Sequence, residues 1–195
     1  MRLVLGLGNP GERYARTRHN VAWWVLDELV ARHGAQAGSR ESKYETRRMR
    51  LGEHDVELMK PLTFMNLSGE AWMQWRERHE LDAAGLLVVS DDVYLPLGTL
   101  RLRASGSSGG HRGLESLEAA LGHREYARLR FGVGAAESSA GLREHVLEEF
   151  APDEMPALEE AVRLAADAVE SWVSEGALAA MNKFNRKVRK EVSES

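Results

Sequence analysis

Residues 1–20 read MRLVLGLGNPGERYARTRHN. The first eight residues form an apolar run that ends in glycines, which is typical of a buried strand entering a tight turn. A helix-like apolar pattern begins only after Asn20, so a long polar loop separates this strand from the first predicted helix. Because ligands of open α/β sheets bind at the carboxyl ends of the strands, this loop is the first candidate for a binding site.

The rest of the chain continues the alternation of strands and helices. Further strands are predicted over 43–51, 54–61, 85–90, 98–103 and 127–134. Helices are predicted over 21–32, 68–79, 114–121 and 142–149, then from Pro152 to just before Gly176, with a last short helix ahead of a basic tail over 183–190. Asn20, and either Asn66 or Ser68, are predicted to cap helices. Strands that alternate with helices predict an α/β fold.

Length and composition exclude several classes of protein. A chain of 195 residues can form one domain with a buried core, and the lack of cysteine excludes disulfides and thiolate nucleophiles. No apolar run is long enough to span a bilayer, and the N-terminus lacks the apolar region of a signal peptide. We therefore expect a cytoplasmic enzyme or binding protein.

The charge distribution leaves an anionic partner open. The net charge is −4, and the acidic excess lies in residues 141–195. Short basic groups occur earlier, at Arg47, Arg48, Arg50, Arg101, Arg103, Arg128 and Arg130. Local potential decides phosphate binding, although solvated strand edges explain these arginines equally simply.

His19 and Asp91 are the strongest candidates for catalysis. The imidazole pKa lies near neutrality, and His19 follows the first strand, where a strand-end site is expected. Asp91 ends the buried strand over 85–90 and can orient a histidine base and stabilise its protonated form. The alternative is a histidine packed beside a helix start and an acid that simply ends a strand.

Three other chemistries have weaker support. Gly6–Gly11 matches a dinucleotide fingerprint, but Pro10 and a long loop separate it from the helix that should bind the pyrophosphate. Serines of the loop over 104–113 lack the G-x-S-x-G turn of a serine nucleophile. Asp91 and Asp92 with His111 could suggest a metal site, but the histidines lack ligand spacing.

Two more loops face the same sheet edge if the sheet is parallel there. The loop over 61–69 presents Phe64, Met65 and Asn66, and the loop over 104–113 presents backbone N–H groups and Arg112. Aromatic rings, amides and a helix N-terminus suit the end of a nucleic acid. Core packing is the alternative for Phe64 and Met65.

Several motifs resemble those of bacterial peptidyl-tRNA hydrolases. They are Gly6-Leu7-Gly8-Asn9-Pro10-Gly11, Tyr14, Thr17-Arg18-His19-Asn20, Lys60-Pro61-x-Thr63-Phe64-Met65-Asn66-Leu67-Ser68-Gly69, Asp91-Asp92, Leu95-Pro96-x-Gly98, Gly109-Gly110-His111-x-Gly113-Leu114 and Arg128-Leu129-Arg130-x-Gly132-x-Gly134. Their order and spacing match over residues 1–150, and separate blocks make the resemblance specific.

The resemblance implies a fold and an activity. It implies a monomeric, single-domain α/β protein over 1–195, with a central mixed, mostly parallel sheet flanked by helices, and with 141–195 forming a helical lid and C-terminal helices. It implies hydrolysis of the ester that joins a peptide to the 3′-terminal adenosine of tRNA, which recycles tRNA. It implies no metal, no organic cofactor, no membrane and no protein partner.

The resemblance also implies roles for individual residues. His19 is the base that accepts a proton from water, and Asp91 keeps it basic and oriented. Asn9 recognises the peptide, and Asn66 donates a hydrogen bond near the substrate carbonyl. The residues expected to contact substrate or tRNA are Tyr14, Phe64, Met65, Asn66, Arg103, Arg112 and Arg130.

The sequence departs from the family pattern in three places. Arg112 stands where asparagine is usual, and arginine cannot accept a hydrogen bond, so this side chain binds phosphate or turns away. Ala22 replaces a common glycine, and the segment over 135–142 is short and lacks lysine. The competing hypotheses are a catalytically silent RNA-binding relative and a nucleotide-binding oxidoreductase.

Overall fold

The computed structural model describes residues 1–36, 38–134 and 141–185. One sheet has the strand order β2-β3-β1-β4-β6-β5. The strands are β1 (Arg2–Gly6), β2 (Tyr44–Leu51), β3 (His54–Pro61), β4 (Leu86–Asp92), β5 (Leu100–Arg103) and β6 (Ala127–Gly132). The four inner strands are parallel and the two edge strands are antiparallel to their neighbours. The predicted mixed, mostly parallel sheet is confirmed.

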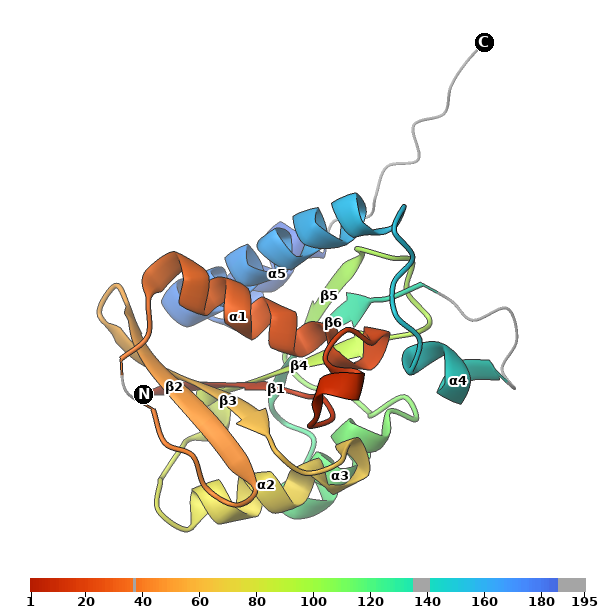
Figure 1. The fold of residues 1–195 in the computed structure, drawn as a ribbon. Coiled ribbons are helices and arrows are strands. Elements are labelled where there is room, and N and C mark those ends of the chain that lie inside the picture. Colours follow the sequence, from red (N-terminus) through yellow and green to blue (C-terminus); the bar gives the residue numbers. More distant parts are fainter. Residues whose placement is uncertain (37, 135–140, 186–195) are drawn as a thin grey trace.

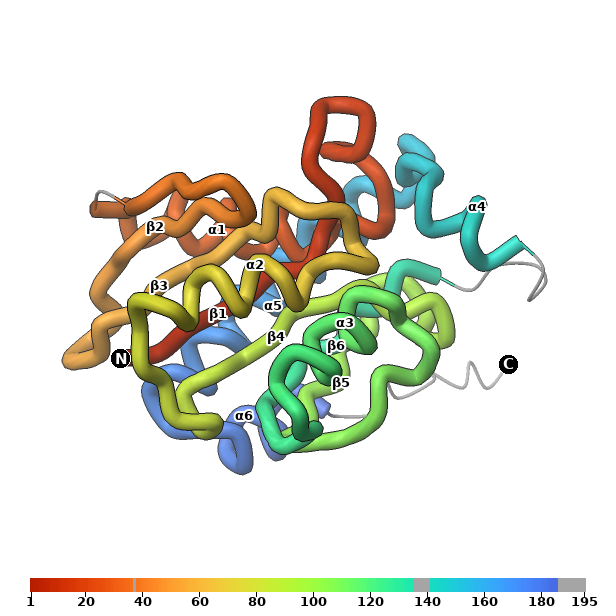
Figure 2. Tube along the Cα trace, turned by 90° about the horizontal axis from the view of Figure 1, so that it is seen from below, coloured from red at the N-terminus to blue at the C-terminus, as the bar shows by residue number. Residues whose placement is uncertain are grey.

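Helices cover both faces of this sheet. They are α1 (Val21–His33), α2 (Ser68–Arg76), α3 (Arg112–Leu121), α4 (Leu142–Val146), α5 (Met155–Glu175) and α6 (Ala177–Phe184), with short 3-10 turns η1 (Glu12–Tyr14), η2 (Arg18–Asn20), η3 (Met65–Leu67) and η4 (Ala83–Gly85). Figure 1 shows α1 and α5 on one face and α2 and α3 on the other. In the view from below, α2 and α3 lie in front of the sheet (Figure 2).

The central strand β4 explains the two layers. All seven of its residues, LLVVSDD, are buried. Leu87 and Val89 join the core under α1 and α5, whereas Leu86 and Val88 join the core under α2 and α3. This alternation follows from the two-residue period of a strand, and an apolar run is needed because both faces are covered.

The topology brings the candidate residues together at the carboxyl ends of the parallel strands. Because β1, β3, β4 and β6 are parallel, the loops after them all leave from the same side of the sheet, where these strands end. The loop after β1 is held tightly against α1, where a Cβ added to Gly8 would lie 2.6 Å from the Trp23 ring. The Trp23 indole N–H also donates to the Gly6 carbonyl at 2.9 Å.

Some predicted boundaries and caps are wrong. The helix expected from Pro152 begins at Met155, with a proline in its first turn. Asn20 does not cap α1 with its side chain, and Ser68 donates to the Met65 carbonyl instead of capping α2. Residues 135–140 of the predicted loop, and 186–195 with the end of the basic tail, lie outside the described residues.

Within the described residues, no helix is both long and apolar enough to cross a membrane.

Candidate active site

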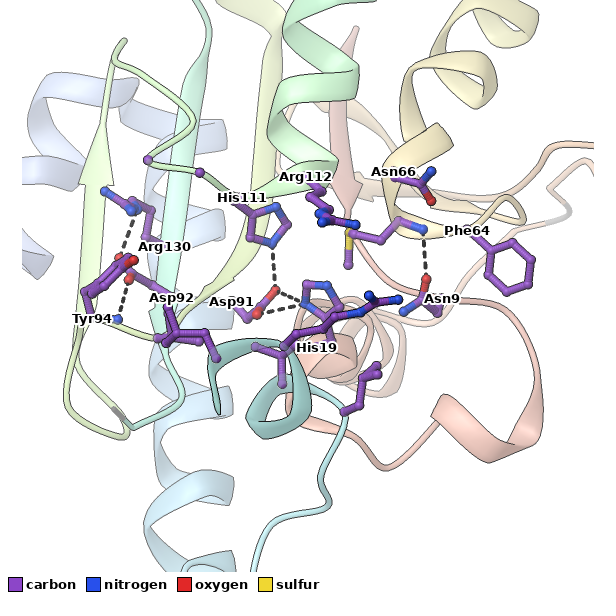
Figure 3. Close-up of a pocket in the computed structure, with 18 of the residues that line it drawn as sticks. Asn9, His19, Phe64, Asn66, Asp91, Asp92, Tyr94, His111, Arg112 and Arg130 are labelled. Carbon is purple, nitrogen blue, oxygen red and sulfur yellow. Dashed lines mark hydrogen bonds and ion pairs between the residues drawn. The ribbon is translucent and has the colours of Figure 1, made fainter. Parts of the chain in front are cut away.

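A pocket of about 370 Å³ opens at the carboxyl edge of the parallel strands (Figure 3). It lies between the loops after β1, β3 and β4, the start of α3, and α4. The predicted site residues that line it are Asn9, Tyr14, His19, Phe64, Met65, Asn66, Asp91, Arg112 and Arg130. Of the predicted set, Arg103 does not line the pocket.

His19 and Asp91 meet directly in this pocket. His19 lies on the η2 turn and Asp91 near the end of β4, and the His19 Nδ1 atom is 2.8 Å from both carboxylate oxygens. The Asp91 side chain is 1% exposed, whereas the His19 side chain is 13% exposed. An ionised carboxylate accepts hydrogen bonds only, so Nδ1–H is the donor and the Nε2 lone pair is left toward the pocket.

Electrostatics favours charge on both partners. Burial lowers the pKa of the His19 imidazole, but attraction to Asp91 and the hydrogen bond with it outweigh burial, so the pKa is raised above its ordinary value. Burial would raise the pKa of Asp91, but His19 and His111 hold it well below its usual range. Asp91 is therefore an ionised carboxylate at neutral pH, placed to stabilise the imidazolium form of His19.

His111 is a second histidine on the same carboxylate. Its Nε2 atom lies 2.8 Å from Asp91 Oδ1. Its Nδ1 atom accepts from the backbone N–H groups of Gly113 and Leu114, at 3.2 and 3.3 Å, and so caps α3. Nδ1 thus carries no proton, and Nε2–H donates to Asp91. A catalytic role for His111 is not predicted from the sequence, although the Gly109-Gly110-His111 motif marks its position.

His19, Asp91 and His111 also form the one group of potential metal ligands found in the described part of the chain. One ligand atom from each of His19, Asp91 and His111 lies within 4.8 Å of the others. However, the two histidine–carboxylate distances are 2.8 Å, whereas two ligands of one tetrahedral zinc ion lie about 3.3 Å apart. The geometry is that of a hydrogen-bonded array, and the absence of a metal remains a prediction.

Asn9 is fixed by hydrogen bonds on three sides. Its side-chain oxygen accepts from the Met65 backbone N–H at 2.8 Å. Its backbone N–H donates to Asn20 Oδ1, and its carbonyl accepts from Asn20 Nδ2, both at 2.9 Å. Because the Asn9 oxygen is occupied, its NH₂ group is the part free to donate into the pocket. Asn20, predicted as a helix cap, instead positions Asn9.

Aromatic and apolar side chains form the side of the pocket near Asn9. Tyr14 and Phe64 contact edge to face, with ring centroids 6.4 Å apart. Phe64 is 52% exposed, so core packing does not explain it, whereas Met65 is 5% exposed and packs against the start of α3. Asn66 lies exposed on the same rim, across the pocket from Asp92 and Arg130 (Figure 3).

The predicted cationic residues differ in their surroundings. Arg112 is exposed at the start of α3, and its side chain makes no hydrogen bond or ion pair with a described residue. Arg130 is paired with Asp92 at 2.9 Å, which leaves less of its charge for a phosphate. Arg103 of β5 is the register partner of Arg128 near the start of β6, so it lies at the amino ends of the parallel strands, away from the pocket. Arg143 of α4 lines the pocket and was not predicted.

The described lining residues include no serine, threonine, cysteine or lysine. A side-chain nucleophile of those types is therefore missing from the described pocket wall. A base with an open ring nitrogen, an ionised partner and amide donors can instead activate water and stabilise a developing oxyanion.

Comparisons with known proteins agree with this chemistry. The family model described as peptidyl-tRNA hydrolase matches residues 3–192. The peptidyl-tRNA hydrolase of Syntrophomonas wolfei is 44% identical over 187 residues, covering 95% of this chain and 100% of that protein. That of Chloroflexus aggregans is 45% identical over 186 residues, covering 95% and 99%. The crystal structure of peptidyl-tRNA hydrolase from Acinetobacter baumannii gives a TM-score of 0.88 at 30% identity, covering 95% and 94%.

Proposed function

Because the chain belongs to the peptidyl-tRNA hydrolase family, we propose that it hydrolyses the ester between a peptide and the 3′-terminal adenosine of tRNA, with His19 as the general base. One observation carries this assignment. The Nδ1 atom of His19 is held by Asp91 at 2.8 Å, which leaves Nε2 as the ring nitrogen that can take a proton in the pocket.

The proposed reaction uses water as the nucleophile. His19 Nε2 takes a proton from water while the water oxygen attacks the ester carbonyl carbon. The tetrahedral intermediate collapses, and the same proton passes to the departing 3′ oxygen, which yields a free tRNA 3′ hydroxyl and a peptide carboxylic acid that loses its remaining proton to solvent. Asp91 stabilises the imidazolium that exists between the two proton transfers. An ester needs no stronger nucleophile because its leaving group is already activated.

The other pocket residues support binding and orientation. The Asn9 NH₂ group, fixed by Met65 and Asn20, is placed to bind the peptide part of the substrate. Asn66 donates near the scissile carbonyl, and Tyr14 and Phe64 offer ring faces to the 3′-terminal base or to a peptide side chain. Arg112 binds a backbone phosphate of the acceptor end. The protein acts in this scheme as a cytoplasmic monomer.

The test replaces the base. His19→Ala is expected to fold, to bind substrate and to release peptide from N-acetyl-aminoacyl-tRNA about 10²–10⁴-fold more slowly, with cooperative unfolding retained. The matched control is His33→Ala, since His33 lies on α1 and pairs with Glu170 away from the pocket. Full activity of the folded His19→Ala protein would exclude His19 as the base. Tight tRNA binding without hydrolysis by the wild-type protein would favour the silent RNA-binding relative.

A further inference from the structure

The residue before the proposed base is a buried arginine with a fixed carboxylate partner. The Arg18 side chain is 8% exposed, and its two terminal nitrogens lie 3.0 and 2.7 Å from the two oxygens of Glu154. One of these nitrogens also donates to the Val133 carbonyl at 2.8 Å. The Arg18 hydrogen bonds hold the pKa of Glu154 below its ordinary value, so the pair is charged at neutral pH.

The segment over 147–154, which connects α4 to α5, folds around this arginine. The Arg18 guanidinium lies 4.7 Å from the centre of the Phe150 ring, and that ring packs against Trp24 of α1. The Arg18 backbone N–H donates to the Glu148 carbonyl at 2.9 Å. Glu154 also accepts from the Ala151 backbone N–H at 2.7 Å. The side chain and the backbone of one residue therefore bind this connecting segment to the η2 turn.

The connecting segment matters because α4 forms one wall of the pocket. Leu142, Arg143 and Val146 of α4, and Leu147 directly after it, all line the pocket. Figure 1 shows α4 at the margin of the molecule, apart from the two helical layers that cover the sheet. Among the described residues, His145 of α4 also contacts the segment after β6, because its ring N–H donates to the Gly134 carbonyl at 3.0 Å. The contacts of Arg18 with the connecting segment therefore contribute, together with His145, to holding α4 in place.

We propose that Arg18 and Glu154 are positioning residues that hold the α4 wall at a fixed distance from His19, and so set the width of the substrate pocket. The proposal rests on the proposed function, since the wall matters only if substrate lies between α4 and His19. Neither residue touches the reacting atoms. Their pair joins the turn that carries the base to the segment that carries the wall, across 136 residues of sequence.

The pair is expected to affect substrate binding more than the chemical step. Removing Glu154 leaves the Asp91–His19 contact in place, because Asp91 belongs to β4 and Arg18 keeps its bond to Val133. The base therefore remains oriented, while the connecting segment loses its charged contact with Arg18 and keeps the backbone hydrogen bond of Glu148 and the Phe150 contact described above. Interactions lost equally from the bound substrate and the transition state raise KM without lowering kcat.

The experiment measures kcat and KM separately for Glu154→Ala and Glu154→Gln, using N-acetyl-aminoacyl-tRNA. For Glu154→Ala we expect KM to rise about ten-fold or more with kcat within about three-fold of wild type. Glu154→Gln keeps one acceptor for Arg18 and is expected to give a smaller rise. Asp167→Ala is the matched control, because Asp167 pairs with Arg32 at 2.6 Å between α1 and α5 and does not line the pocket.

Hydrogen exchange supplies a readout that does not depend on activity. The amides of residues 142–151 are expected to exchange faster in Glu154→Ala, while those of β1 and β4 keep their protection. If Glu154→Ala does not fold, Glu154→Gln gives the same two measurements. The proposal is overturned by an unchanged KM and unchanged exchange, or by an equal rise of KM in Asp167→Ala. A wild-type protein without hydrolytic activity would refute the proposed function, while hydrogen exchange would still test the contact itself.

Discussion

Replacing Asp91 by asparagine tests the proposed mechanism at its most constrained point. The change keeps the shape of the side chain but exchanges one oxygen for an NH₂ group. Among the described residues, Oδ1 of Asp91 accepts from both His19 and His111, whereas Oδ2 contacts His19 only. His111 cannot reverse its tautomer, because its Nδ1 atom faces the N–H groups of Gly113 and Leu114. The asparagine oxygen must therefore take the Oδ1 position.

This orientation directs the new NH₂ group at His19 Nδ1. Two N–H groups cannot face each other at 2.8 Å, so His19 either carries its proton on Nε2 or shifts away from the NH₂ group to keep only its hydrogen bond with the oxygen at the Oδ1 position. In the first case Nε2 has no lone pair for water, and in the second it is displaced from its position and lacks the carboxylate charge that stabilises the imidazolium. We expect kcat to fall by about 10²–10⁴-fold, the range for loss of a general base, with KM changed far less.

The pH profile separates this explanation from a simple change of charge. Asp91 raises the pKa of His19, so wild-type activity is expected to rise with pH through a value above 6.5. Without the carboxylate charge the pKa falls, so the imidazole of Asp91→Asn is more fully deprotonated at neutral pH and the protein is nevertheless slower. The measurement is kcat for peptide release from N-acetyl-aminoacyl-tRNA between about pH 5 and 9.

Asp92→Asn is the neighbouring comparison. Asp92 pairs with Arg130 and accepts from the Tyr94 N–H, without contacting either histidine. We expect its kcat to fall less than about ten-fold, since no tautomer is forced. An Asp91→Asn protein that keeps more than about a tenth of wild-type kcat, with its profile unmoved, would refute the assignment of the proton on His19.

Two further predictions follow from the surroundings of the pocket. Arg112→Ala should weaken tRNA binding more at low salt than at high salt, and reduce the slope of log affinity against log salt by about 0.7–0.9; equal loss at all salt concentrations would rule out a phosphate contact. Asn20→Ala leaves the buried N–H and carbonyl of Asn9 without their Asn20 hydrogen bonds. It should therefore lower the free energy of unfolding, measured by urea denaturation, by about 1–3 kcal/mol for each group. Unchanged stability would contradict the positioning role of Asn20.

The sequence predicted the sheet because its strands are simple to recognise. The runs around Val4 and Val88 are continuously apolar, as strands covered on both faces must be. Once these strands are parallel, the residues after them meet at one edge, so the proximity of His19 and Asp91 follows from topology. The direction of β5 could not be predicted in this way. A short strand has the same alternation in either direction. Because β5 is antiparallel to β6, Arg103 lies beside the start of β6, away from the pocket.

Side-chain contacts between residues distant in the chain could not be predicted from the sequence. Local propensity makes Asn20 a good helix cap, yet its side chain contributes more by holding the buried backbone of Asn9. The Arg18–Glu154 pair joins positions 136 residues apart, and no spacing rule connects them. Arg128 looked like a member of a basic surface group, but it is 1% exposed and donates to the Ser107 carbonyl under the loop that carries His111.

The choice between two histidines illustrates what the structure adds to the motifs. His19 and His111 both contact Asp91 and both lie in the pocket, so proximity to the carboxylate cannot identify the base. Counting the ring nitrogens can. Both nitrogens of His111 are engaged, one with Asp91 and one with the α3 backbone, whereas His19 engages only Nδ1 among the described residues. A general base needs an accepting nitrogen that faces substrate, and His19 is the histidine of this pair that offers one.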